Sequence, residues 1–256
     1  MLKQRKKENF NLFVPACLIL FLNLSGCMKE GNQRDIRGYY FPLEKLTAGE
    51  IYVYKAVGNV GTDTIYWYYR SFLKGDKKIF SSTFYENDLA PLQHVQEEIV
   101  SNGLLLKHLF LYELPDTTAG YKQERTEAES IAGNTFQFEV RDSLGIFLYH
   151  IQWKPKEKEV SRYRVIKNRR FMGDTIFVSN KKEIPAVYFK VREKIEVENE
   201  GVTGQLFEGM EIYAKGIGLV YYEKKMSPQY NMAYRFVTGM SMGALEKKWE
   251  KEKRIN

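Results

Sequence analysis

Residues 187–198 read VYFKVREKIEVE, and this stretch limits the possible folds more than any other part of the chain. Apolar and polar side chains alternate along it, which is the pattern of a β-strand with one buried face and one hydrated face. Five residues form the apolar face: Val187, Phe189, Val191, Ile195 and Val197. Glu193 lies on the same face, where an unpaired charge would be costly. We expect this carboxylate to line a cavity, to pair with an arginine or to lie beyond the edge of the core.

The same face is the candidate ligand-binding site. Val187, Phe189, Val191 and Ile195 would form the apolar floor of a concave pocket. Glu193 would then be its polar anchor, because ligand pockets combine apolar walls with a few polar groups. The ligand would be a lipid, an acyl chain or a hydrophobic segment of another protein. We expect no cofactor.

The period-2 pattern continues on both sides of this stretch. Runs rich in Tyr, Val, Ile and Phe predict strands at 50–58, 63–73, 78–85, 93–100, 103–113, 145–153, 158–168, 174–179, 185–198, 206–215, 218–224 and 229–238. Asn102-Gly103 predicts a hairpin with a type I′ turn, and Gly173-Asp174 predicts another turn. The polar segment 116–133 predicts a loop or a short helix, which could separate two β halves at 38–115 and 134–240.

Many strands and few helices predict a mostly β fold. We expect a strongly curved antiparallel sheet in the form of a half-barrel, or alternatively a sandwich of two sheets. Residues 241–256 predict a short C-terminal helix, because Leu245 and Trp249 are four residues apart and charged residues alternate around them.

The first residues have the three parts of an export signal. Four basic side chains come first: Lys3, Arg5, Lys6 and Lys7. An apolar run follows at 10–22, which is shorter than the about 20 residues of a membrane-spanning helix. Leu24-Ser25-Gly26-Cys27 comes next and resembles the lipobox of bacterial lipoproteins.

This resemblance implies cleavage between Gly26 and Cys27 and a diacylglycerol on the cysteine thiol. It divides the chain into a signal peptide at 1–26, a lipidated tether at 27–37 and a β-rich domain at 38–240. Several acyl chains hold a protein firmly at a membrane, since each buried methylene contributes about 0.8 kcal/mol. The expected partner is therefore a membrane, reached through the lipid on Cys27.

Two further likenesses concern the location of the protein. In two-membrane bacteria an Asp after the lipidated cysteine favours the inner membrane, so Met28 implies the outer membrane. Lys29-Glu30 resembles the charged surface-export signals of Bacteroidota lipoproteins without their acidic run, and both the periplasmic face and the cell surface stay open. Residues 211–220 resemble a strand pair of β-rich envelope lipoproteins, some of them likened to lipoprotein carriers. Gly216 and Gly218 would let a sheet bulge or bend there.

Composition argues against some classes of function. The chain has 256 residues and a formal charge of +7, and the signal peptide removes four basic residues and one acidic residue. The remaining charge of +4 is too small to predict a nucleic-acid partner. Cys17 leaves with the signal peptide and Cys27 carries lipid, so the mature protein is expected to lack disulfides and thiolate metal ligands.

No group of residues predicts an active site. Residues 239–243, GMSMG, match the nucleophile-elbow formula, but no Asp or His follows them, and Ser241 is better explained as a helix N-cap. His94, His108 and His150 are too far apart in sequence for a local metal site, and the last two are expected in the core. We therefore expect a protein that is not an enzyme and holds no metal.

Two clusters have ordinary structural explanations. Tyr66-Trp67-Tyr68-Tyr69 is expected to pack across neighbouring strands, although rings on a wet face can also stack on sugars. Residues 154–170 hold eight basic side chains against two acidic ones. A solvated hairpin face is the expected explanation, and contact with anionic lipid head groups is the alternative.

Two functions are compatible with these observations. The first is an outer-membrane lipoprotein that binds an apolar ligand or hydrophobic segment on a concave sheet face. The second is a structural or assembly lipoprotein that docks another envelope protein and binds no small ligand.

Overall fold

Long strands dominate the computed structural model, which describes residues 33–85, 90–113, 124–141, 146–155 and 160–253. The chain divides into Met1–Gly31 and Asn32–Asn256, and all described residues belong to the second unit. Cys27 and the predicted signal peptide therefore lie outside the described residues.

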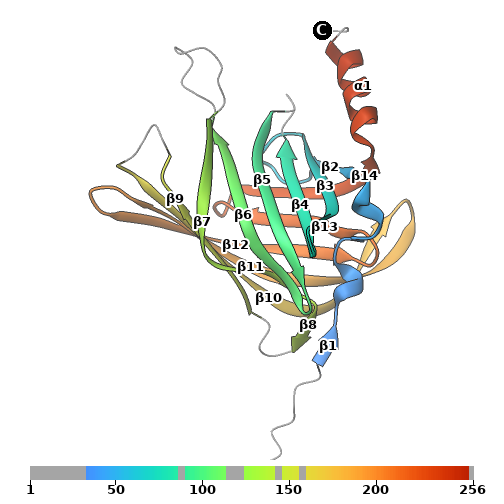
Figure 1. Cartoon of the computed structure of the whole chain (residues 1–256), viewed down its shortest axis with the longest axis horizontal. Coiled ribbons are helices and arrows are strands. Elements are labelled where there is room, and N and C mark those ends of the chain that lie inside the picture. The colour runs from blue at the N-terminus through green and yellow to red at the C-terminus, as the bar shows by residue number, and fades with distance from the viewer. Residues whose placement is uncertain (1–32, 86–89, 114–123, 142–145, 156–159, 254–256) are drawn as a thin grey trace, which may run out of the picture. The chain divides into compact units, whose positions relative to one another are not determined.

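The described residues form a closed barrel of twelve strands with antiparallel pairing (Figure 1). In chain order these strands are β2 (Glu50–Ala56), β3 (Thr64–Lys74), β4 (Lys77–Tyr85), β5 (Pro91–Val100), β6 (Gly103–Glu113), β7 (Glu124–Gln137), β9 (Ile146–Trp153), β10 (Arg162–Ser179), β11 (Lys182–Glu198), β12 (Val202–Ala214), β13 (Gly218–Lys225) and β14 (Asn231–Met240). Each strand pairs with the next barrel strand along the chain. The barrel closes where β14 pairs with β2, so that Tyr234 lies opposite Ala56.

The mostly β fold with a C-terminal helix is confirmed, whereas the half-barrel and the sandwich are wrong. Closure gives each of the twelve barrel strands two neighbours, so the barrel sheet of the described residues has no unpaired edge. β7 begins inside the segment 116–133, which was expected to be a loop or a short helix. Its positions Thr126 and Ala128 are small or polar, so the strand lacks the apolar alternation that identifies the others. The predicted halves, 38–115 and 134–240, are therefore parts of one barrel.

The alternation of residues 187–198 is confirmed in β11. Val187 and Phe189 are fully buried, while Lys190 and Arg192 on the other face are exposed. The turn that precedes this strand has φ angles of 49° at Asn180 and 64° at Lys181. Two positive φ angles are the requirement of a type I′ turn, which matches the twist of the two long strands.

Two of the predicted turns differ from the structure. The hairpin at Asn102-Gly103 is present, with Val100 opposite Gly103, but Asn102 does not have a positive φ and the turn is not type I′. Gly173 lies inside β10 rather than in a turn, where its φ of 124° accompanies a register shift against β11. Residues 158–168 and 174–179, predicted as two strands, thus contribute to one.

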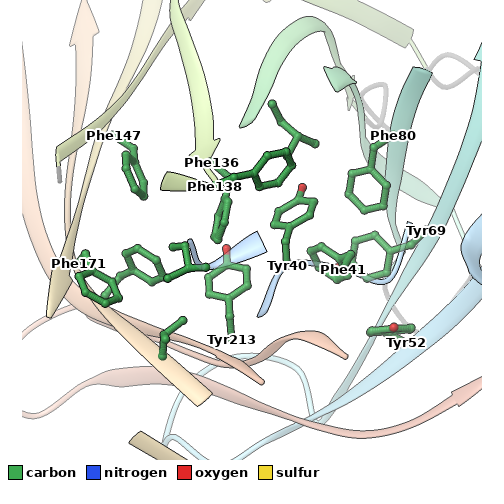
Figure 2. Close-up of a cluster of buried hydrophobic side chains, with 14 of the residues drawn as sticks. Tyr40, Phe41, Tyr52, Tyr69, Phe80, Phe136, Phe138, Phe147, Phe171 and Tyr213 are labelled. Carbon is green, nitrogen blue, oxygen red and sulfur yellow. The ribbon is translucent and has the colours of Figure 1, made fainter. Parts of the chain in front are cut away.

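A segment at the start of the described chain fills part of the barrel interior. β1 (Gln33–Asp35) pairs with β8 (Glu139–Arg141), and two 3-10 turns follow, η2 (Arg37–Tyr39) and η3 (Lys45–Thr47). Ile36, in the predicted tether, is fully buried, so the folded part begins earlier than residue 38. Figure 2 shows Tyr40 and Phe41 of this segment among rings from the barrel wall.

Aromatic rings make up most of this core. The Tyr40 ring lies 5.6 Å from that of Phe80 on β4 and 4.6 Å from that of Phe136 on β7. Phe41 lies against Gly218, which has a φ of 102°; a Cβ there would be 2.5 Å from the Phe41 ring. Gly216 and Gly218, both with positive φ, therefore shape the turn between β12 and β13, and Gly218 also leaves space for Phe41. A register shift between these strands follows at Ile212 and Tyr213, close to the bulge or bend that was expected.

The C-terminal helix packs on the outside of the barrel. Leu245 of α1 (Met242–Lys253) is fully buried with Ile51 and Val53, the outward side chains of β2. The Ser241 Oγ accepts a hydrogen bond of 3.2 Å from the Ala244 N–H, which confirms its role as the N-cap. Within the described ranges, no helix combines the length and the apolar character needed to traverse a bilayer.

Candidate ligand-binding cavity

The barrel interior contains a partly open cavity of about 460 Å³. Its apolar wall is made by inward-facing side chains from both sides of the barrel: Trp67, Tyr69, Val95, Leu109, Leu111, Ile151, Trp153, Val165, Val191, Phe207, Tyr222 and Met232. Tyr40 and Phe41 of the interior segment also reach it. Side chains of alternate residues meet inside the barrel because every strand places its even or odd positions on one face.

The aromatic block at 66–69 contributes two rings to this wall. Trp67 and Tyr69 are stacked with ring centroids 6.0 Å apart, and Trp67 also stacks on Phe84 across the β3–β4 pair at 5.0 Å. The expected cross-strand packing is thus present. The Trp67 indole nitrogen is buried and has no hydrogen-bond partner in the described part of the chain.

A charged cluster lies on one side of the cavity. The Arg169 Nε donates to Glu211 Oε2 at 2.6 Å, and its Nη1 donates to the Thr135 carbonyl oxygen at 2.9 Å. The Lys167 Nζ lies 2.6 Å from Glu211 Oε1. The Tyr213 hydroxyl donates to Glu211 Oε2 at 3.1 Å. Two cations from β10 therefore share one buried carboxylate from β12.

Electrostatics in this cluster hold Glu211 in its charged form. Burial by itself raises the pKa of this carboxyl, but Arg169 and Lys167 outweigh burial and lower the pKa to about 2. Burial by itself lowers the pKa of the Arg169 guanidinium, but Glu211, Tyr213 and Glu97 together raise it above its usual range.

Glu97 on β5 is the second buried carboxyl of the cavity. Its Oε2 accepts a hydrogen bond of 3.5 Å from the Tyr40 hydroxyl. Burial raises the pKa of Glu97, and the hydrogen bond to Thr135 and the charge of Arg169 oppose this only in part. Two carboxyls in one cavity thus have pKa values shifted in opposite directions.

Glu193 also lines the cavity, where it pairs with Lys224 of β13. The Lys224 Nζ lies 4.3 Å from the centroid of the Phe207 ring, a cation–π contact. Of the three explanations expected for Glu193, the cavity and a cationic partner are both present, with lysine in place of arginine. Glu193 is not the one polar anchor, because the cluster around Glu211 faces the same space.

The four apolar residues predicted with Glu193 separate in the structure. Val191 lines the cavity. Val187 and Phe189 are buried in the aromatic core of the barrel instead, and Phe189 lies 5.6 Å from the Tyr213 ring. Ile195 is half-buried and lies outside the lining of the cavity as the described residues define it. Three of the four members of the predicted floor therefore lie outside the lining of this cavity.

Sequence reasoning missed the central charged residues. Lys167 and Arg169 lie in the basic stretch 154–170, which was expected to be solvated, and Glu211 lies in the strand-pair resemblance. The sequence does contain an indication that they face inward. Lys167 and Arg169 occupy alternate positions between the apolar residues Val165 and Phe171, so all four lie on one face of the strand. The expectation of a hairpin face fits the start of β10. Arg162 and Arg164 lie there opposite Glu198 and Glu196 of β11 and form ion pairs with them.

The other candidate residues lie outside the cavity. His108, expected in the core, faces outward and lies 2.7 Å from Glu127, and its side chain is 44% exposed. A register shift between β6 and β7 places it there, because it breaks the alternation after Leu106. His150 also faces outward, opposite Ile166. In the described part of the chain, no three His, Cys, Asp or Glu side chains are arranged to hold a metal ion.

Glu211 predicts a stability that depends on acidic pH. Its pKa is lowered from 4.5 to about 2, so its contribution is fully present above pH 4.5 and is lost as the pH falls towards 2. We expect the free energy of unfolding to fall by about 2–3 kcal/mol over this range through this group. Glu97 has a raised pKa, so its effect has the opposite sign: it lowers the free energy of unfolding as the pH rises above 4.5.

Urea unfolding at fixed pH values between 2.5 and 5 measures this effect. Glu211→Gln should flatten the acid dependence, because the titrating group is absent. The control is Glu208→Gln on the same strand, since the Glu208 side chain is 63% exposed and pairs with Arg192. An unchanged acid slope in Glu211→Gln would show that the cluster does not hold this carboxylate as described.

No family model and no curated protein matches the chain. Two solved structures are similar to it. One is a candidate lipoprotein from Parabacteroides distasonis ATCC 8503, with 11% identity, a TM-score of 0.47, and coverage of 79% of this chain and 98% of that one. The other is a candidate exported protein with YmcC-like fold from Bacteroides fragilis NCTC 9343, with 11% identity, a TM-score of 0.46, and coverage of 75% and 95%.

Proposed function

We propose that this chain is an outer-membrane lipoprotein whose barrel holds an apolar ligand in its central cavity. The observation that carries the proposal is the cavity of about 460 Å³ inside the closed barrel. Its size is within the range of about 300–1,000 Å³ for ligand pockets, and it combines an apolar wall with a few polar groups, as such pockets do. The Trp67 indole N–H, which has no hydrogen-bond partner among the described residues, is a donor for an acceptor atom on the ligand.

The membrane location rests on the N-terminal sequence. The lipobox-like Leu24-Ser25-Gly26-Cys27 provides the lipid-bearing cysteine, and the first described strand starts soon afterwards at Gln33. Met28 favours the outer membrane. We include in the proposal that the protein is not an enzyme, because Ser241 caps a helix and His94 and His108 lie on the outer face, bonded to Thr83 and Glu127.

Native mass spectrometry of the mature protein tests ligand binding. We expect an apolar molecule to co-purify with the wild type. Val165→Trp should exclude it, because the larger ring would occupy the cavity from β10. Val178→Trp is the matched control, since Val178 is exposed on the same strand. Equal ligand content in the two variants, or no ligand and no uptake of a neutral probe such as N-phenyl-1-naphthylamine, would remove the proposal.

One observation favours the second candidate function, docking of another envelope protein. Leu105 of β6 and Leu148 of β9 are exposed on the outer face, on the strands that flank β7. Exposed apolar side chains on neighbouring strands favour protein contact when they form a patch. A stable protein partner lost in Leu105→Ser, together with an empty cavity, would favour docking over ligand binding.

A further inference from the structure

The inward-facing charges of the cavity are unequally paired. The described residues that line it include three cations, Lys167, Arg169 and Lys224, and five carboxylates. Two of the carboxylates have partners at alternate, outward positions: Glu208 pairs with Arg192, and Glu223 accepts a hydrogen bond from the Tyr221 hydroxyl. The other three are Glu97, Glu193 and Glu211. Glu193 and Lys224 form one pair. Lys167 and Arg169 both bind Glu211, so two cations share one carboxylate. Glu97 makes no ion pair within the described chain.

Donor groups beside Glu211 are in excess. Arg169 has five N–H donors, and its three hydrogen bonds go to Glu211 twice and to the Thr135 carbonyl once. Lys167 has three donors and one ion pair, to Glu211. Both side chains line the cavity, so their remaining N–H groups can reach a molecule inside it. A second anion at this position would accept hydrogen bonds from these donors and would balance the second of the two cations that share Glu211.

We propose that the cavity selects a ligand with one oxyanion head group on an apolar chain, with the head bound by Arg169 and Lys167. This inference rests on the proposed ligand-binding function and names the class of ligand. The chain would extend along the wall formed by residues such as Leu109, Ile151 and Phe207. The head is a carboxylate or a phosphate, since both accept hydrogen bonds from a guanidinium and an ammonium group.

Glu97 is the group that would compete with the ligand anion. The groups that face it are Tyr40 of the interior segment, Thr135 of β7, Tyr149 of β9, Arg169 of β10 and Tyr213 of β12. Of these, Arg169 is the cation, and it favours the ionised form of Glu97. When Glu97 is protonated, the cavity has one surplus positive charge, and the ligand anion can balance it. Binding of the anion is therefore coupled to uptake of one proton by Glu97.

Competition in native mass spectrometry tests this selection with the full lipidated chain in detergent. Dodecanoic acid and 1-dodecanol are added in equal amounts at pH 7, and dodecyl phosphate replaces the acid in a second arm. We expect at least a tenfold excess of bound acid or phosphate over bound alcohol. Preference for the carboxylate arm indicates a fatty-acid type of ligand, and preference for the phosphate arm indicates a lipid head group; either supports the oxyanion.

Three variants separate a charge effect from general damage. Lys167→Met should reduce the acid-to-alcohol ratio about tenfold, whereas Lys167→Arg should preserve it. Glu97→Gln should raise acid binding at pH 7 and remove the increase in acid binding that the wild type shows as the pH is lowered, because the glutamine cannot ionise. Micelle partition is common to all proteins and cancels in these comparisons.

The outcomes distinguish this inference from the function on which it rests. Equal binding of acid and alcohol by the wild type, or an equal loss of both in Lys167→Met, would overturn the oxyanion site and leave an apolar cavity. If the wild type binds neither the acid nor the alcohol, and Val165→Trp does not differ from it in either amount, the ligand-binding function itself fails.

Discussion

Replacement of Cys27 by alanine is expected to abolish lipidation completely. In the proposed lipoprotein the thioether would lie on this residue, and cleavage after Gly26 would leave no other cysteine, because Cys17 precedes that position. The variant should accumulate as uncleaved precursor or as protein released from the membrane. Without acyl chains the mature protein loses the methylene burial that holds it, about 0.8 kcal/mol for each group.

Metabolic labelling with a palmitate analogue measures this effect, and fractionation of the membranes measures release. Cys17→Ala is the matched control, since it removes a cysteine of the signal peptide and should keep the label. Label on the Cys27→Ala protein would disprove the anchor, and so would loss of the label in Cys17→Ala.

Truncation of Phe189 to alanine is expected to destabilise the barrel by about 3–5 kcal/mol, the usual range for a fully buried phenylalanine. Phe189 is fully buried, and its ring lies 5.7 Å from those of Phe136, Phe147 and Phe171, on three different strands. The variant would leave a space that these rigid rings cannot fill without moving the strands.

Equilibrium urea unfolding, followed by circular dichroism, measures the loss. Leu206→Ala on the neighbouring strand β12 is the control, because Leu206 is 60% exposed and should cost less than about 0.5 kcal/mol. If the two variants unfold at the same urea concentration, the ring at 189 does not have the packing described.

Strand positions were predictable because most strands repeat the alternation seen at 187–198. Closure of the barrel was not predictable from the sequence. It depends on the pairing of β2 with β14, and neither strand has a sequence feature that identifies the other as its partner. β7 was missed because its inward positions hold residues such as Thr126 and Ala128. Such residues fit inside the barrel without an apolar pattern, so periodicity identifies a strand only where the space it faces needs large side chains.

The candidate site was predictable only in part. Glu193 was singled out because a charge interrupted an apolar face, and it does line the cavity. The same interruption of an apolar alternation occurs at Glu211, between Phe207 and Tyr213. That Arg169 meets Glu211 follows from the register of three adjacent strands, β10, β11 and β12, which a single sequence does not specify.

The seam between β14 and β2 has a consequence for how the chain folds. All other barrel pairs join strands that follow one another, so local hairpins can form early and in any order. Bringing Tyr234 to Ala56 restricts nearly the whole folded sequence, and the logarithmic part of this loop-closure entropy is about 4–5 kcal/mol. Tyr40, near the beginning, also lacks its contact with Tyr213 until the last strands have been delivered. A chain that is exported beginning with its N-terminus would therefore stay only partly folded during most of its passage, and two free strand edges would persist until the final residues emerge.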